Sequence, residues 1–155
     1  MQIKLDRKKL DNLLKISKDV YKVKVGVING GGEKAPDGNL TVAGYGYINE
    51  VGSIINNIPQ RSFIRSPLSL KLKQEMLRLK ETYAKLFFKE QKIKEAYNIL
   101  GLSCKGIILD AFSTSNGGAW APNSAFTIKK KGSSKPLIDT GRLRKSIDFK
   151  VIKNK

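Results

Sequence analysis

The side chains that most often carry chemistry are scarce in this chain of 155 residues, which has no histidine and a single cysteine, Cys104. Without an imidazole there is no histidine general base, and serine–histidine or cysteine–histidine nucleophile pairs are excluded. An intramolecular disulfide and a zinc site of cysteine and histidine are excluded as well. Cys104 falls on an apolar helical stripe, which predicts a core-filling thiol rather than a nucleophile.

One carboxylate, Asp139, lies in a segment that could be catalytic. The run Leu137-Ile138-Asp139-Thr140-Gly141 matches the triplet of aspartic proteases, in which two such loops place paired carboxylates on one shared proton. A homodimer could supply the second loop. Two features count against a protease: Arg142 follows the glycine where that family has a small residue, and a guanidinium there would hold the aspartate ionised. The stretch after Gly141 is also short for the remaining sheet of that fold.

The alternative interpretation of the same run is a structural turn. In that interpretation Asp139 caps the following segment, and Gly141 adopts a backbone conformation that other residues avoid. Leu143 and Ile147, four residues apart, then pack inward on one face of a helical turn.

The remaining carboxylates do not form a constellation with catalytic spacing. Glu50 and Asp110 are isolated in the sequence, and four glutamates alternate with lysines on predicted helices, which is typical of solvated faces. Those four are Glu75, Glu81, Glu90 and Glu95. We therefore expect no catalytic residue, no cofactor and no metal ion.

The net charge of +17 predicts a polyanionic neighbour, either nucleic acid or an acidic protein surface. A basic chain from a lysine-rich proteome is the alternative. The densest basic patch, with Trp120 and Phe126 nearby, could bind single-stranded nucleic acid through cations and stacked aromatics. A solvated loop would have the same composition, and no helix-turn-helix, zinc-finger or RNA-recognition signature accompanies the patch. Its residues are Lys129, Lys130, Lys131, Lys135, Arg142, Arg144 and Lys145.

The first half of the chain contains predicted elements of several kinds. Asp6 can cap a helix that runs to about Lys18, and alternating valines and lysines predict a half-buried strand over residues 21–28. The composition of residues 29–39, with three consecutive glycines, predicts a flexible loop that becomes ordered on contact with a neighbour. A short helix is predicted over residues 41–52, and an irregular or extended segment over 58–65.

A helical hairpin is predicted for the middle of the chain. Ser66 as N-cap and Pro67 at the first position open its first helix. A break near residues 88–91 would let two helices pack side by side, and Gly101 and Gly106 could permit close approach. The apolar stripes are Leu72, Met76, Leu79, Tyr83 and Leu86, then Ile93, Tyr97, Leu100, Cys104, Ile107 and Ala111. After a loop and a basic turn, a helical turn over residues 142–147 and a terminal strand over 148–153 complete the chain.

The length suits a single domain over residues 1–155. No apolar run approaches the roughly 20 residues that would span a bilayer, so we expect no membrane partner. The first residues, Met1 to Asp6, lack the apolar core of a secretion signal. We therefore expect assembly in a host cytoplasm.

Two separate blocks of this sequence resemble phage virion-morphogenesis and tail-completion proteins, a family that joins head and tail. The C-terminal block, residues 129–147, is similar to a basic small-residue stretch followed by Pro-Leu-x-Asp-Thr-Gly-x-Leu and a Ser-Ile pair. Trp120-Ala121-Pro122 with Thr127 looks like the Trp-x-Pro and Thr that often precede it. Glu50-Val51-Gly52 followed by residues 58–67 is similar to the family's Glu-x-Gly and Ile-Pro-x-Arg-x-Phe-hydrophobic-Arg. The order of the blocks and the helical stretch between them also fit.

The resemblance implies an α+β fold in which a small mixed or antiparallel β-sheet packs on a long helical hairpin. It implies a non-enzymatic structural protein in the neck or upper tail of a virion, acting as a neck adaptor, in tail completion or as a tail-tube cap. It implies a homo-oligomeric ring, a hexamer or dodecamer, that contacts a connector, stopper or tail-terminator protein. The expected subunit-contact or structural residues are Arg61, Phe63, Arg65, Trp120, Asp139, Gly141, Arg142 and Leu143.

The charge is where this chain departs from that pattern. Channel surfaces in such machines are often acidic, so that DNA slides past them, whereas this chain is strongly basic. Its lysines would then face outward or toward acidic partner subunits. The alternative function is a basic nucleic-acid-binding protein that makes a non-specific contact with packaged DNA in the channel.

Overall fold

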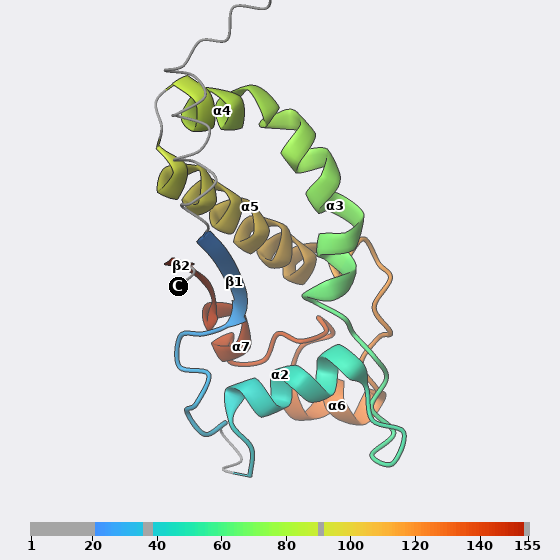
Figure 1. Ribbon diagram of the computed structural model, residues 1–155. Coiled ribbons are helices and arrows are strands. Elements are labelled where there is room, and N and C mark those ends of the chain that lie inside the picture. The colour runs from blue at the N-terminus through green and yellow to red at the C-terminus, as the bar shows by residue number, and fades with distance from the viewer. Residues whose placement is uncertain (1–20, 36–38, 90–91, 154–155) are drawn as a thin grey trace, which may run out of the picture.

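The computed structural model describes residues 21–35, 39–89 and 92–153, so the helix predicted over residues 6–18 lies outside the described residues. The fold is α+β, as predicted: a two-stranded antiparallel sheet packs on a long helical hairpin (Figure 1). The elements in chain order are β1 (Tyr21–Val27), α2 (Val42–Val51), α3 (Arg65–Arg78), α4 (Lys80–Ala84), the π-helix η1 (Lys85–Lys89), α5 (Ile93–Thr114), α6 (Ala125–Lys131), α7 (Arg142–Lys145) and β2 (Ile147–Lys153).

The sheet joins the two ends of the described chain. β1 and β2 pair in antiparallel register, with Tyr21 opposite Lys153 and Val27 opposite Ile147. The alternation in β1 has the predicted effect, because its valines are half-buried while Lys22 and Lys24 are exposed. This pairing confirms both predicted strands, and helix α5 packs against both of them.

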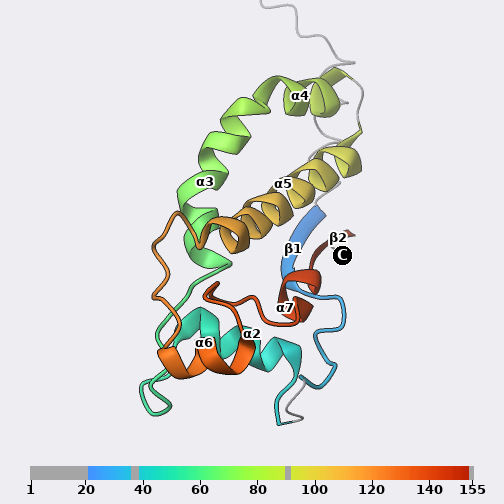
Figure 2. The ribbon, with the colours of Figure 1, turned by 180° about the vertical axis from the view of Figure 1, so that it is seen from behind.

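The helical hairpin has a bent first arm and a straight second arm. The first arm consists of α3, α4 and η1, and it bows away from α5 before the chain turns back (Figures 1 and 2). The turn falls between η1 and α5, where the break was predicted. The predicted stripe on α5 is buried at Cys104, and burial raises the pKa of that thiol, in keeping with a core role. The stripe predicted for the first helix is wrong at Met76 of α3, because this side chain is 45% exposed.

One glycine allows the second arm to lie close against the sheet. A Cβ at position 101 would overlap the ring of Phe149 on β2, so Gly101 is the point of closest approach between α5 and the sheet. The parallel prediction for Gly106 is wrong, because a Cβ there would meet no other atom within 4 Å. Gly106 faces away from the sheet and is exposed.

The main core is aromatic and draws on distant parts of the chain. Phe63, Phe112 and Trp120 are buried together, with ring centroids 5.3 Å apart for the two phenylalanines and 5.8 Å apart for Phe112 and Trp120. Ile108 of α5 and Ile147 of β2 complete this cluster and are almost fully buried. Such tilted and edge-on aromatic pairs add to the free energy of area burial.

A polar contact beside the core ties together β2, α5 and the end of β1. The Asp148 carboxylate accepts hydrogen bonds from Lys105 Nζ at 2.9 Å and from the Asn29 side-chain amide at 2.6 Å. The Lys105 ammonium, together with the Phe149 backbone N–H, holds the pKa of the Asp148 carboxyl below its usual value.

The glycine-rich segment after β1 is folded onto the domain over residues 29–35. Backbone N–H groups of Val42 and Ala43 donate to Glu33 and Gly31, and Ala35 pairs with Leu40. Gly31 and Ala35 are buried. Residues 29–35 thus make backbone contacts within the domain, and the prediction that this loop becomes ordered on contact with a neighbour stays a prediction.

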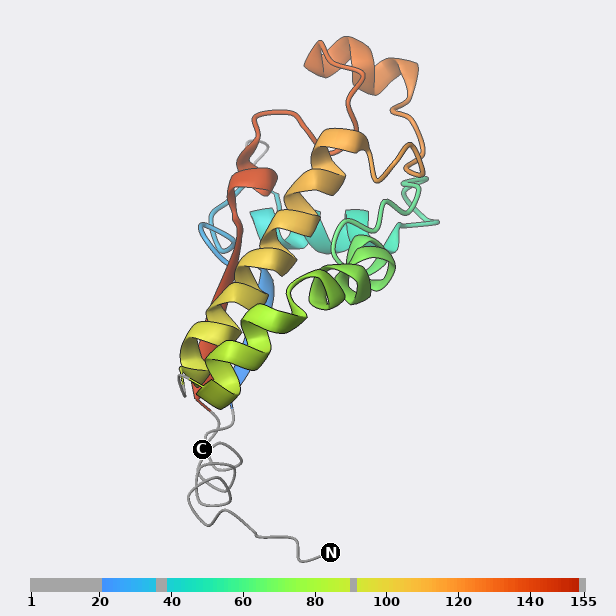
Figure 3. The ribbon, with the colours of Figure 1, turned by 90° about the horizontal axis from the view of Figure 1, so that it is seen from above.

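Helix α6 was not predicted, because its lysines were assigned to a basic turn. Ser124 caps it by accepting the N–H of Thr127 at 3.2 Å, and Gly132 ends it in the left-handed region at φ 65°. Lys129, Lys130 and Lys131 form its last turn, where cations favour the negative end of the helix dipole. Figure 3 shows α6 standing apart from α2 and from the sheet.

The two glycines of α5 provide a matched pair of substitutions. Replacing Gly101 with alanine should lower the free energy of unfolding by about 1–3 kcal/mol, because the new methyl overlaps the Phe149 ring. Replacing Gly106 with alanine should raise it by up to about 1 kcal/mol, because alanine is the better helix former. Denaturant unfolding of both variants measures the difference, and equal effects would contradict the close approach at Gly101.

Candidate functional site

The first motif block is organised by the Glu50 carboxylate near the end of α2. It accepts backbone N–H bonds from Phe63 at 2.7 Å, Ile64 at 3.0 Å and Arg65 at 3.0 Å. The Ser62 hydroxyl also donates to it at 2.7 Å. A single side chain thereby satisfies three N–H groups at the start of α3 and places a negative charge at the positive end of that helix dipole.

This arrangement corrects the predicted start of the hairpin. Ser66 is not the N-cap of α3, because the helix begins at Arg65 and the N–H of Ser66 itself donates to the Ser62 hydroxyl at 3.0 Å. Glu50 is not isolated either, although the groups that donate hydrogen bonds to its carboxylate lie 12–15 residues away in the sequence. Pro67 fits in this first turn because it needs no N–H partner there.

Gly52 explains the glycine of the Glu-x-Gly pattern. Its backbone lies at φ 80°, where α2 ends, and its N–H closes that helix by donating to the Ile48 carbonyl at 2.7 Å. A Cβ at position 52 would lie 3.0 Å from the backbone nitrogen of Gln60. The glycine therefore allows the chain to turn back along the end of α2, where Arg61 N–H donates to Asn49 at 2.7 Å.

Arg61 connects the first motif block to the Trp-Ala-Pro segment. Its side chain is buried and donates through Nε to the Ala121 carbonyl at 2.8 Å and through Nη2 to the Pro122 carbonyl at 2.9 Å. Burial lowers the pKa of this guanidinium from its ordinary value, because water is removed from the charged form. A second bond joins the same two segments, because the Trp120 indole N–H donates to the Ser62 carbonyl at 3.1 Å.

Lys131 plays a similar part for the C-terminal block. Its Nζ donates to the carbonyls of Lys135 at 2.5 Å and Ile138 at 2.7 Å. Desolvation lowers the pKa of the Lys131 ammonium, and the nearby Arg61 charge acts in the same direction while Asp139 opposes it. Asn123 adds two donated bonds, to the carbonyls of Ser134 and Lys135. The irregular segments on both sides of α6 are thus held by side-chain donors.

The turn at Asp139 is partly as predicted. Gly141 lies at φ 76°, and Leu143 and Ile147 both belong to the core, as expected. Asp139 does not cap α7: the N-cap is Gly141, without a side-chain cap bond, and Asp139 is exposed. The α7 turn starts from the left-handed glycine rather than from a carboxylate.

The predicted site residues therefore divide into two groups. Arg61, Phe63, Trp120 and Leu143 lie inside the fold and act on its structure. Arg65, Asp139 and Arg142 are exposed, and the Arg142 guanidinium makes one long bond of 3.4 Å to the Lys34 carbonyl.

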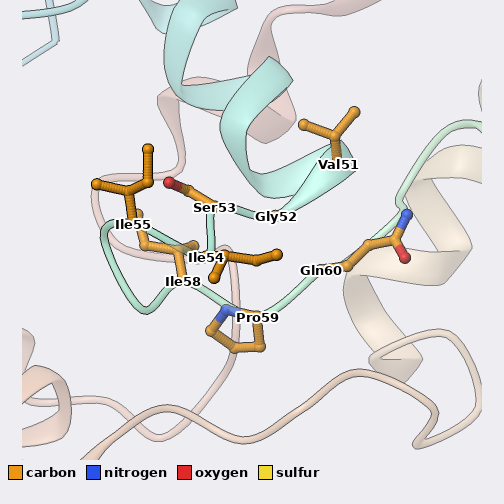
Figure 4. A pocket seen from close by; sticks show the side chains of 8 residues that line it. All are labelled: Val51, Gly52, Ser53, Ile54, Ile55, Ile58, Pro59 and Gln60. Carbon is orange, nitrogen blue, oxygen red and sulfur yellow. The ribbon is translucent and has the colours of Figure 1, made fainter.

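The most exposed apolar residues of the described chain were not among the residues predicted from the sequence. Ile54 is 100% exposed and Ile55 is 97% exposed, in a turn between the paired residues Ser53 and Ile58 (Figure 4). Turns favour Gly, Asn, Asp, Ser and Pro. Two adjacent isoleucines in a turn were therefore the sequence feature that could have indicated an exposed apolar surface. Tyr47 and Val51, one helical turn apart on α2, are exposed as well.

The basic patch is spread over two elements, and only one of its aromatics is available. The exposed cations of α6 and α7 include Lys129, Lys130 and Arg144. Phe126 of α6 is 77% exposed, whereas Trp120 is only 6% exposed and belongs to the core. The predicted role of Trp120 as a stacking surface is therefore wrong, and that of Phe126 stays open.

Comparison with known proteins adds no relationship, since no protein-family model, no curated protein and no solved structure matches this chain. Among the described residues, no helix is both long and apolar enough to cross a membrane. Nor do these residues include a group of three or more cysteine, aspartate or glutamate side chains placed to hold a metal ion.

The Glu50 network yields a stability prediction. Replacing Glu50 with alanine should lower the free energy of unfolding by about 2 kcal/mol, because the Phe63, Ile64 and Arg65 N–H groups lose their charged acceptor. The matched control is Glu81→Ala, an exposed glutamate of α4, which should change stability by less than about 0.5 kcal/mol. Denaturant unfolding monitored by circular dichroism compares the two, and equal stabilities would argue against capping by Glu50.

Proposed function

We propose that this chain is a non-enzymatic structural protein of a tailed-phage virion that joins head and tail, in the neck or in tail completion, as one subunit of a ring. The proposal starts from the resemblance of its two motif blocks to head–tail joining and tail-completion proteins. It extends to the partners implied there, namely further copies of the chain and a connector, stopper or tail-terminator protein.

The observation that carries the proposal is the convergence of the motif blocks on one junction. Glu50 holds the start of α3, Arg61 holds the Trp-Ala-Pro segment, and Trp120 binds back to Ser62. Segments 58–61 residues apart in the sequence thus act as one unit. Their polar groups bind backbone rather than lining a cleft, which favours an architectural role over a catalytic one.

The surfaces around this junction suit an assembly module. The turn at Ile54 and Ile55 offers apolar side chains to a partner, and leaving such a side chain in water forgoes about 1.5–3 kcal/mol of burial. On another part of the molecule, α6 presents lysines and Phe126. Separate contact surfaces on one subunit are what a ring between different layers of a virion requires.

Electron microscopy of virions carrying an epitope-tagged chain tests this proposal. We expect the label at the head–tail junction, in a ring whose symmetry gives the number of copies. Phage that lack the chain should accumulate unjoined heads and tails, and the wild-type chain supplied in trans should restore joining. Purified virions without the chain, or a label on the capsid surface or tail tip, would overturn the proposal.

The second candidate is a basic nucleic-acid-binding protein, which the exposed pairing of Phe126 with Lys129 and Lys130 on the projecting helix α6 favours. It predicts binding to single-stranded DNA that falls steeply with salt and weakens by about tenfold in Phe126→Ala, because base stacking is worth about 1–3 kcal/mol. Leu102→Ala, an exposed leucine of α5 away from α6, is the matched control. Mobility shifts at moderate salt measure this, and no shift for the wild-type chain rules the second candidate out.

A further inference from the structure

The region around the exposed isoleucines is one of two long stretches of the chain that contain no lysine or arginine, the other being residues 106–128. Lysine and arginine make up 30 of 155 residues, yet residues 35–60 contain neither. On α2 and in the turn after it, this stretch exposes four large apolar residues. We call them the apolar knob: Tyr47, Val51, Ile54 and Ile55.

The turn of the apolar knob is held in one conformation by its own hydrogen bonds. Ser53 and Ile58 bond to each other in both directions at 2.8 Å, and the Asn57 N–H donates to the Ile54 carbonyl at 3.0 Å. The Asn56 side chain donates to the Ser53 hydroxyl at 3.1 Å. The Gln60 side-chain amide then donates to the Glu50 carbonyl, which holds the segment after the turn against the end of α2. A rigid surface loses little conformational entropy when it docks, which favours affinity.

A complementary apolar surface lies on the first arm of the hairpin. A groove of about 750 Å³ runs along α3, α4 and η1, a size within the range of binding clefts. Its apolar lining includes Leu72, Met76, Leu77, Phe87 and Phe88, and three of these side chains are among the exposed large hydrophobics of the described chain. We call it the hairpin groove.

The apolar knob and the hairpin groove cannot meet within one molecule. Figure 1 places the turn after α2 and the α4 end of the hairpin at opposite ends of the fold. Two different, mutually complementary surfaces on one chain make a heterologous contact, which closes into a ring when the rotation allows. We propose that the apolar knob of one copy docks in the hairpin groove of the next copy, an inference that rests on the ring of the proposed function.

Charge favours a second copy as the occupant. A chain of net charge +17 repels its own copies, and at physiological salt this repulsion acts mainly over about 8 Å. A contact between copies is therefore most favourable where one side has no cations, which is the case for the apolar knob. Lys73 and Lys80 lie along the hairpin groove. The amide oxygens of Asn56 and Asn57, beside the isoleucines, are uncharged acceptors that suit these ammonium groups.

Two variants separate the surfaces, and a third is the control. The knob variant is Ile54→Asn/Ile55→Asn and the groove variant is Leu77→Asn/Phe88→Asn. The control is Leu70→Asn, an exposed leucine of α3 outside the groove. All five positions are exposed, and melting curves verify that each variant folds. Mass photometry and sedimentation of the full chain, treated with nuclease, then measure assembly as a function of concentration.

We expect the wild-type chain and the control to form rings or short oligomers. The knob variant and the groove variant should each assemble only at a protein concentration at least about tenfold higher. Added salt should strengthen assembly, because it screens the repulsion between copies. Mixing the knob variant with the groove variant should give a one-to-one dimer and nothing larger, because only one intact knob and one intact groove remain.

Crosslinking gives an independent readout, because Cys104 is buried and a new surface cysteine stands out. Ile54→Cys/Leu77→Cys with a thiol-specific crosslinker should yield a ladder of covalent oligomers, whereas Ile54→Cys alone should not. Dimers from Ile54→Cys alone would indicate knob-to-knob pairing and overturn the proposal. So would a wild-type chain that stays monomeric at all concentrations, or one that assembles only with another virion protein. If the chain is found in the virion but the knob and groove variants assemble normally, only this inference fails. If the two variants lose assembly but the chain is absent from virions, the proposed function fails.

Discussion

The fold depends on one carboxylate at the start of one helix. Glu50 binds the N–H groups of residues 63–65 and the hydroxyl of Ser62, so α2 and α3 are joined at their ends by a side chain. This bond sets the direction in which α3 leaves, and hence where the hairpin stands. It also places Phe63 where Phe112 and Trp120 enclose it. The isoleucine turn lies between the two elements that Glu50 joins, so its position is set by the same contact.

Two cations, the buried Arg61 and the partly exposed Lys131, donate to backbone carbonyls in the irregular segments on either side of α6. The segments before and after α6 contain carbonyls that no helix or strand satisfies, and such groups need partners when buried. Arg61 and Lys131 each supply two bonds to them. Two of the surplus positive charges are therefore explained by the fold itself and give no information about a polyanionic partner. The cations on α6 and α7 that face solvent are the ones that can.

The sequence predicted elements whose signals are local and periodic. Both strands, α2, the hairpin and the left-handed Gly141 follow from alternation, apolar stripes and glycine placement. It could not predict that Glu50 would cap α3, because the bond joins residues 12–15 positions apart and a local serine offered a more obvious cap. Nor did it separate Gly101 from Gly106, since only the position of Phe149 on a distant strand distinguishes them. Helix α6 could have been predicted, because Ser124 and Gly132 are its caps, but its lysines suggested a loop. Among the candidate site residues, type alone could not tell the buried Arg61 from the exposed Arg65.

The distribution of charge links these observations to assembly. If the positive charge served only general solubility, cations would be spread evenly, and residues 35–60 would contain about their share. Instead this stretch has none, and it is the stretch that exposes the two isoleucines. Two isoleucines in a rigid, uncharged turn are an aggregation hazard unless a defined surface covers them. A net charge of +17 opposes indiscriminate association, and the missing cations weaken that opposition along residues 35–60. In the proposed ring, charge and apolar surface would act together, the first to prevent contacts between copies in general and the second to permit a specific one.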